Sequence, residues 1–124
     1  MSLKILVADD EPNIVISLEY LLKREGYTVA VARDGQEALD AITRDTPDLV
    51  LLDVMMPKKT GFEVCQEVRA NEALHGLKIL MLTAKGRDTD VAKGTALGAD
   101  AYMTKPFSTR DLVQKVADML GRTP

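Results

Sequence analysis

The five residues Leu49-Val50-Leu51-Leu52-Asp53 join an uninterrupted apolar run to a single carboxylate. An apolar run without polar alternation is typical of a strand that is covered on both faces, as in a parallel sheet flanked by helices. Because the strands of an open parallel sheet all point the same way, their carboxyl ends share one edge, and ligands bind there. The run therefore predicts a buried strand that presents Asp53 at that edge.

Four further apolar runs alternate with amphipathic segments along the chain. The five runs together cover Leu3 to Ala8, Thr28 to Ala32, Asp48 to Leu52, Leu77 to Thr83 and Ala101 to Thr104. The first, third and fourth are the most apolar, so we expect them at the centre of the sheet. Strand and helix alternation with right-handed crossovers predicts an α/β fold, a doubly wound sheet of five parallel strands.

Capping patterns mark the starts of the intervening helices. Pro12 suits a first helical turn. The spacing of a capping box or its acidic relative occurs at Asp34 and Glu37, at Thr60 and Glu63, and at Ser108 and Asp111. The segment from Arg87 to Leu97 predicts the weakest helix, because it contains Gly94, and an interior glycine costs about 1 kcal/mol relative to alanine. We expect a movable element there.

Length and composition fit one globular domain. The 124 residues are 46% hydrophobic and 28% charged, and the formal net charge of -3 argues against a nucleic-acid or anionic-membrane binder. The single Cys65 excludes an internal disulfide. No apolar stretch reaches the roughly 20 residues of a membrane span and no signal pattern begins the chain, so we expect a cytoplasmic protein. Only three residues follow Gly121, which predicts one domain over 1–124 and no output domain in this chain.

Charged residues follow three of the predicted strands. Asp9 and Asp10 follow the first run, Asp53 follows the third and Lys105 follows the fifth, so we expect them to meet at one sheet edge. Crowded carboxylates repel one another, and at least one should have a raised pKa. Mg²⁺ prefers oxygen ligands and binds through one or two carboxylates plus phosphate oxygens. Asp10 and Asp53 are the natural metal ligands, with Asp9 close behind, acting through water.

A set of separated motifs resembles the receiver domain of bacterial two-component response regulators, in particular the chemotaxis-type single receiver domain. The motifs are Asp9-Asp10, Asp53 with Pro57 and Gly61 after it, Thr83-Ala84, and Lys105-Pro106-Phe107. The resemblance spans essentially the whole chain. It implies the flavodoxin-like strand order 2-1-3-4-5, with five helices in a three-layer α/β/α arrangement. It also implies a cis peptide bond between Lys105 and Pro106.

The resemblance implies a signalling function rather than that of an enzyme acting on an external substrate. Asp53 would accept a phosphoryl group from a histidine kinase or histidine phosphotransfer protein, in a reaction that depends on Mg²⁺, with Mn²⁺ as an alternative ion. Lys105 and the Thr83 hydroxyl would contact phosphoryl oxygens, and small Ala84 would leave room for the group. If the position of Met55 coordinates the metal, its backbone carbonyl does so.

The resembled family also implies a switch. Thr83 would move toward the phosphoryl group, and Tyr102 would turn inward. Their movement would alter the face formed by the fourth helix, fifth strand and fifth helix, which binds a downstream protein. The alternative for Tyr102 is a half-buried strand aromatic without a switching role. Lys85 and Met55 would influence the lifetime of the acyl phosphate.

Two other functions fit parts of the pattern. A phosphatase of the haloacid-dehalogenase-like kind would use Asp53 as nucleophile, but it places a second Asp where this chain has Met55, which cannot transfer protons. A flavin-binding module of the same fold would carry a Gly/Ser/Thr-rich phosphate loop after the first strand, where this chain has acids.

Cys65 and His75 receive structural interpretations. Cys65 lies on a helical face shared with Val68 and is expected in the core, and His75 is expected on the surface.

We expect no direct nucleic-acid or membrane partner and a monomer or weak dimer. Receivers of the winged-helix transcription-factor type often have an Asp at the position that Ala101 occupies in this chain. Because alanine carries no charge, one ionic contact of their dimer is absent here.

Overall fold

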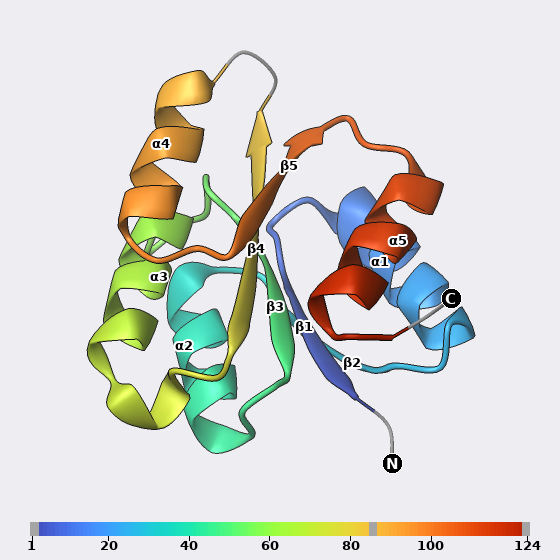
Figure 1. Cartoon of the computed structure of the whole chain (residues 1–124), viewed down its shortest axis with the longest axis horizontal. Helices are drawn as coiled ribbons and strands as arrows, with labels where there is room; N and C mark the ends of the chain where they lie inside the picture. The colour runs from blue at the N-terminus through green and yellow to red at the C-terminus, as the bar shows by residue number, and fades with distance from the viewer. Residues whose placement is uncertain (1–2, 85–86, 123–124) are drawn as a thin grey trace.

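The computed structural model describes residues 3–84 and 87–122, which form three layers, with helices on both sides of one sheet (Figure 1). The strands are β1 (Lys4–Ala8), β2 (Thr28–Ala32), β3 (Leu49–Asp53), β4 (Lys78–Ala84) and β5 (Ala101–Lys105). The helices are α1 (Pro12–Arg24), α2 (Gly35–Arg44), α3 (Gly61–Ala70), α4 (Asp88–Ala96) and α5 (Thr109–Met119), with a 3₁₀ turn, η1, at Glu72–Leu74. Each strand begins and ends within one residue of the apolar run that predicted it.

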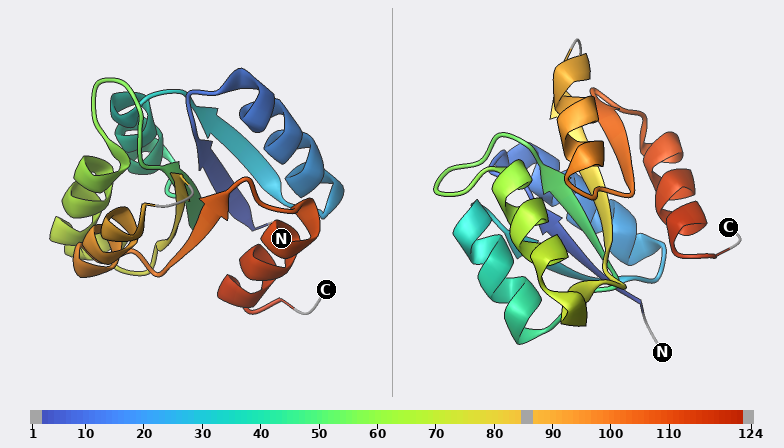
Figure 2. Two further views of the ribbon diagram at one scale, coloured as in Figure 1. Left: turned by 90° about the horizontal axis from the view of Figure 1, so that it is seen from above. Right: turned by 60° about the vertical axis from the view of Figure 1, so that its left-hand side comes forward.

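The sheet is parallel throughout and has the order β2-β1-β3-β4-β5. Helices α1 and α5 cover one face, and α2, α3 and α4 cover the other, as the two views of Figure 2 show. This arrangement confirms the flavodoxin-like order that the resemblance implied. The carboxyl ends of β1, β3, β4 and β5 therefore lie along one edge of the sheet.

The core lies against the three central strands. Every residue of β3 is buried, as are most residues of β1 and β4, whereas the edge strands β2 and β5 are only half-buried. The prediction that the most apolar runs are central is confirmed. Full burial of a leucine side chain such as Leu51 or Leu80 contributes about 1.5–3 kcal/mol to the stability of the folded state. The buried central strands therefore form a stable support for the residues at their carboxyl ends.

The predicted helix starts are confirmed. Asp34 Oδ1 accepts a hydrogen bond from the backbone N–H of Glu37 at 2.7 Å. Thr60 and Glu63 form a reciprocal capping box. The Ser108 hydroxyl accepts from Asp111 N–H at 3.0 Å. A side-chain cap of this kind stabilises a helix by about 1 kcal/mol.

Helix α4 is held differently at its two ends. Among the described residues, no side chain caps its start at Arg87, and its buried residues are Asp90 and Gly94. Beyond its C-terminal end, the Arg69 guanidinium of α3 donates to Gly98 O at 2.9 Å and to Asp100 Oδ2 at 2.8 Å. The sparse packing agrees with the weak helix predicted here.

The expected peptide isomer before Pro106 and the expected burial of Cys65 and exposure of His75 are also confirmed. The Lys105–Pro106 peptide bond is cis. Cys65 is fully buried and His75 is exposed. Within residues 3–84 and 87–122, no helix combines the length and the apolar character needed to cross a membrane.

Candidate functional site

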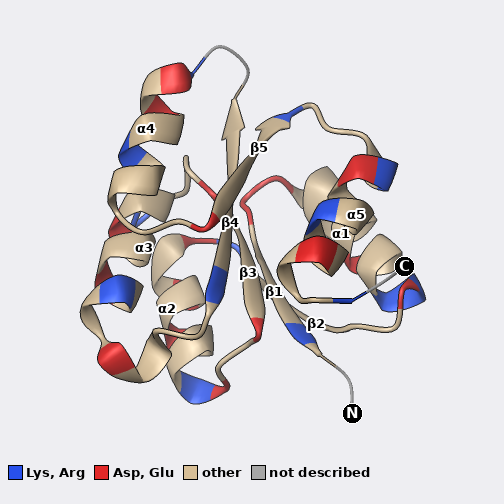
Figure 3. Ribbon diagram, in the orientation of Figure 1, with Lys and Arg blue, Asp and Glu red and all other residues tan. Residues whose placement is uncertain are grey.

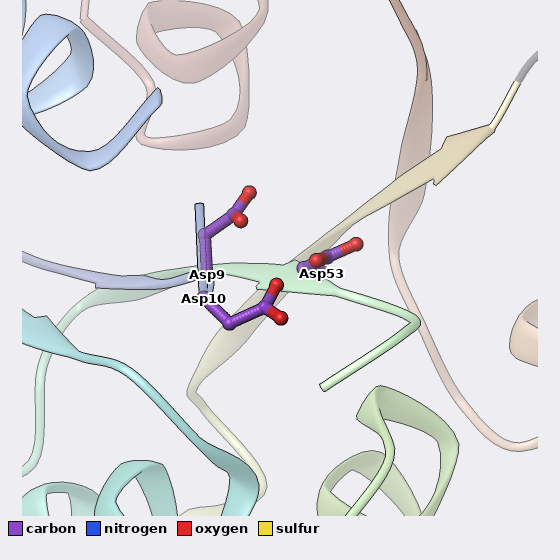
Figure 4. A group of neighbouring side chains, drawn as sticks. All are labelled: Asp9, Asp10 and Asp53. Carbon is purple, nitrogen blue, oxygen red and sulfur yellow. The ribbon is translucent and has the colours of Figure 1, made fainter. Parts of the chain in front are cut away.

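Three carboxylates meet at the carboxyl edge of the sheet (Figure 4). Asp9 and Asp10 follow β1, Asp53 ends β3, and one oxygen of each lies within 4.8 Å of the others. Asp9 is fully buried and Asp53 is 6% exposed, whereas Asp10 is exposed. The predicted convergence is confirmed. Such a set of hard oxygen donors, open to solvent on one side, fits the ligand preference of Mg²⁺.

Lys105, at the tip of β5, supplies the positive charge beside these acids; Figure 3 shows the acidic turn after β1 in red and the tip of β5 in blue. Its ammonium donates to Asp9 Oδ2 at 2.9 Å and lies 3.3 Å from Glu11 Oε1 and 3.5 Å from Asp53 Oδ1. Burial opposes this charge, but the hydrogen bond to Asp9 and the charges of Asp53 and Asp9 outweigh it and raise the pKa of Lys105. The lysine is therefore charged and bound chiefly to Asp9.

Asp53 is the most perturbed acid of the group. Burial, followed by the charge of Asp9, raises its pKa to about 7, while Lys105 and the Met55 N–H act in the opposite direction. The pKa of one carboxylate is raised, as predicted, but burial contributes more to the rise than repulsion between the carboxylates. A divalent cation would offset the repulsion and favour the ionised form, which is the nucleophilic one.

The end of β4 forms another part of the site. Thr83 is buried, and its hydroxyl donates weakly to Met103 O on β5 at 3.4 Å. Ala84 is the last residue of β4 and is exposed. It lines a hollow of about 510 Å³ together with Lys105 and the apolar Ile14, Pro106 and Phe107. The hollow borders Lys105 and Ala84 on the side of α1.

Met55 and Tyr102 have exposed side chains. Met55 is 66% exposed, and its N–H lies 3.4 Å from Asp53 Oδ1. Tyr102 is 49% exposed and lines a hollow between β5 and α5 on the outer surface. Lys85 lies outside the described residues. The sequence predicted no site role for Glu11, although this residue directly follows the acidic pair and contacts Lys105.

Comparison with known proteins agrees with this geometry. Residues 5–117 match the response regulator receiver domain family. A response regulator structure from Chloroflexus aurantiacus J-10-fl is 36% identical, with 98% of this chain and 100% of that chain covered and a TM-score of 0.93. The chemotaxis response regulator CheY4 of Vibrio cholerae is 33% identical, with 97% and 100% covered and a TM-score of 0.91.

A third similar structure holds a metal. It is the receiver domain of sensor histidine kinase PA1611 from Pseudomonas aeruginosa PAO1, with a magnesium ion coordinated in its active site cleft. It is 28% identical, with 98% of this chain and 99% of that chain covered and a TM-score of 0.89. The family match over almost the whole chain, the strand order and the acidic edge lead to one conclusion: this chain belongs to the response regulator receiver domain family.

Proposed function

We propose that this domain accepts a phosphoryl group on Asp53 from a histidine kinase or a histidine phosphotransfer protein. The observation that carries the proposal is the convergence of a buried Asp53, two further acids and one charged lysine at a single edge of the sheet. Bound Mg²⁺, or Mn²⁺ in its place, would neutralise charge on the acids and on the phosphoryl oxygens. Asp10, Asp53 and the Met55 carbonyl would hold the ion, with Asp9 supporting it.

The chain's own residues account for the transfer. One Asp53 oxygen forms the new P–O bond while the P–N bond to the donor imidazole breaks, and the imidazole keeps the bonding electron pair. Lys105 lies 3.5 Å from Asp53 and would contact a phosphoryl oxygen. The Thr83 hydroxyl would contact another, and exposed Ala84 leaves space for the group. The domain thus promotes only its own phosphorylation and dephosphorylation.

The proposal includes a conformational output. Phosphorylation adds roughly 1.5 to 2 negative charges at Asp53. Attraction of Thr83 toward this charge would break its weak bond to Met103 O and vacate space toward which Tyr102 turns. The altered face comprises α4, β5 and α5, and in α4 only Asp90 and Gly94 are buried. We propose that a downstream protein binds to this face. We further propose that residues 1–124 act as one domain and that the signalling takes place in the cytoplasm.

Labelling tests the acceptor. Incubation with acetyl phosphate and Mg²⁺, followed by intact-mass analysis and peptide mapping, should add one phosphoryl group at Asp53. Asp53→Asn should abolish the label, and the matched change Asp40→Asn on the exposed face of α2 should retain it. A label on another residue, or one that forms without a divalent metal, contradicts the proposal.

A second measurement tests the switch. In protein labelled with 3-fluorotyrosine, phosphorylation should reduce the solvent sensitivity of the Tyr102 ¹⁹F signal, because the ring moves from 49% exposed to an inward position. Tyr20, which is 68% exposed on α1, serves as the internal control. An unchanged Tyr102 signal in fully phosphorylated protein would show that Tyr102 has no switching role.

A further inference from the structure

The segment 54–60, which joins β3 to α3 and carries Met55 beside Asp53, lies directly against the start of α2. The Gly35 N–H donates to Pro57 O at 3.2 Å, and the Lys59 N–H donates to the same oxygen at 2.8 Å. The ammonium of Lys58, whose φ is 68°, lies 3.7 Å from Asp34 Oδ2. The loop is therefore fixed by the first turn of a helix that supplies none of the reacting groups.

Gly35 makes this close approach feasible. The residue is buried, and a Cβ built on it would overlap the carbonyl oxygen of Lys59 and lie 2.6 Å from its carbonyl carbon. Atoms do not approach so closely without a shift in one of the two segments. Because the obstructing atoms are the Lys59 carbonyl group and its Cβ, whose positions the backbone fixes, rotation of a side chain does not remove the overlap. Any side chain at position 35 must displace either α2 or the loop.

The other end of the loop has little freedom to absorb such a displacement. The Gly61 N–H donates to Val54 O at 2.8 Å. A Cβ at Gly61 would overlap the carbonyl oxygen of Asp53 and lie 3.0 Å from Val54 Cα. Between these two close contacts, the Met56 side chain is buried in the core. A shift of the loop at Lys59 is therefore transmitted to the residues next to Asp53.

We propose that Gly35 is a positioning residue for the phospho-acceptor site. Its missing side chain lets α2 dock on the backbone of Pro57 and Lys59, and this contact fixes the loop that presents Met55 beside Asp53. The inference rests on the proposed function. Mg²⁺ demands nearly ideal octahedral geometry, and a displacement of about 1 Å at a reacting centre can reduce a rate about 100-fold. The contact lies outside the acids themselves, so it acts through the loop and not through charge.

The test is the rate of acetyl phosphate labelling as a function of Mg²⁺ concentration for Gly35→Ala. We expect the Mg²⁺ midpoint of this curve to rise by at least about tenfold, because the displaced loop weakens metal coordination. Gly76→Ala is the matched control. Within the described part of the chain, a Cβ at Gly76 would have no heavy atom within 4 Å beyond those of Gly76 and its two chain neighbours, and Gly76 has no positive φ. Its midpoint should equal that of the unchanged protein.

Stability must be separated from positioning. The titrations are made where circular dichroism shows each variant folded, with trimethylamine N-oxide added where Gly35→Ala requires it. A merely destabilising change would then lower the labelled fraction in proportion to unfolded protein and leave the midpoint unchanged. That result would overturn the inference. Absence of label in the unchanged protein would instead refute the proposed function.

A second variant disrupts the contact between the loop and α2 without introducing a steric overlap. Insertion of one glycine between Lys58 and Lys59 lengthens the loop and releases it from α2, and surface loops tolerate such insertions well. We expect the Mg²⁺ midpoint to rise in this variant too. A midpoint equal to that of the unchanged protein would show that docking on α2 does not position the site, even if Gly35→Ala failed to fold.

Discussion

Replacement of Asp53 by asparagine should make the metal-free protein more stable at weakly alkaline pH. The change keeps the shape of the side chain and removes a carboxylate that is 6% exposed beside fully buried Asp9. Burial and the charge of Asp9 raise the pKa of Asp53 to about 7 from an ordinary 3.8. The folded protein therefore carries an ionised group that its own surroundings disfavour.

The size of the effect follows from this pKa. Between about pH 4 and pH 7 the folded state keeps a proton on Asp53 that the unfolded state has lost, so the free energy of unfolding falls as pH rises. A rise of about three pKa units corresponds to about 4 kcal/mol above pH 7. The attraction of Lys105 is already contained in the pKa. Asp53→Asn should therefore stabilise the protein by about 2–4 kcal/mol at pH 8, and by about half of that at pH 5.

The assay is urea unfolding followed by circular dichroism, in the presence of a chelator, at both pH values. Asp40→Asn, an exposed acid on α2, should change the free energy of unfolding by no more than about 0.5 kcal/mol. Addition of Mg²⁺ should stabilise the unchanged protein more than Asp53→Asn, because binding to the folded state adds stability. If Asp53→Asn is destabilising at pH 8, or its effect is the same at both pH values, the account of strained charge at this site is wrong.

Three further changes test contacts around the site and α4. Lys105→Ala should lower the free energy of unfolding by about 3–5 kcal/mol in urea titrations, because it leaves the buried Asp9 carboxylate unpaired; an effect below about 1 kcal/mol would contradict the pairing. Gly98→Ala should lower the free energy of unfolding by about 1–3 kcal/mol, because φ at Gly98 is +106° and the added Cβ would lie 2.7 Å from Arg69 Cγ. The control Gly76→Ala should leave the free energy of unfolding almost unchanged. Arg69→Ala should lower the free energy of unfolding by about 1–3 kcal/mol, since it removes the hydrogen bonds to Gly98 and Asp100 beyond the C-terminal end of α4. Amide hydrogen exchange in α4 should also become faster, and unchanged exchange would refute this anchoring role.

Much of the fold could be predicted because local patterns agree with the tertiary structure. The buried strand Leu49–Asp53 has no polar residue before its last position, and the hydroxyl of Thr60 caps α3 as its spacing from Glu63 indicated. These features depend on neighbours in the sequence. The strand order does not depend on neighbours in the sequence. Because β1, β3 and β4 are alike in composition, no local pattern indicates which strand pairs with which. The order came only from the resemblance to a known family.

The site shows the same division. Convergence of Asp9, Asp10 and Asp53 followed from the rule that parallel strands end at one edge. The choice of partner for Lys105 did not follow, since a long side chain reaches several acids, and the shortest contact in the structure is to Asp9. The role proposed for Gly35 was invisible in the sequence, because it depends on backbone atoms of a loop more than 20 residues away.

The ion pair between Lys105 and Asp9 joins residues 96 positions apart. A ribosome-bound chain that has produced only the first four strands would hold all three acids but lack the lysine beside them. Its acidic edge would lack the ammonium that we expect to contact the transferred group. On the proposed function, competence for phosphorylation would arise only when the last strand docks, so a nascent chain would not divert phosphoryl groups from finished receivers.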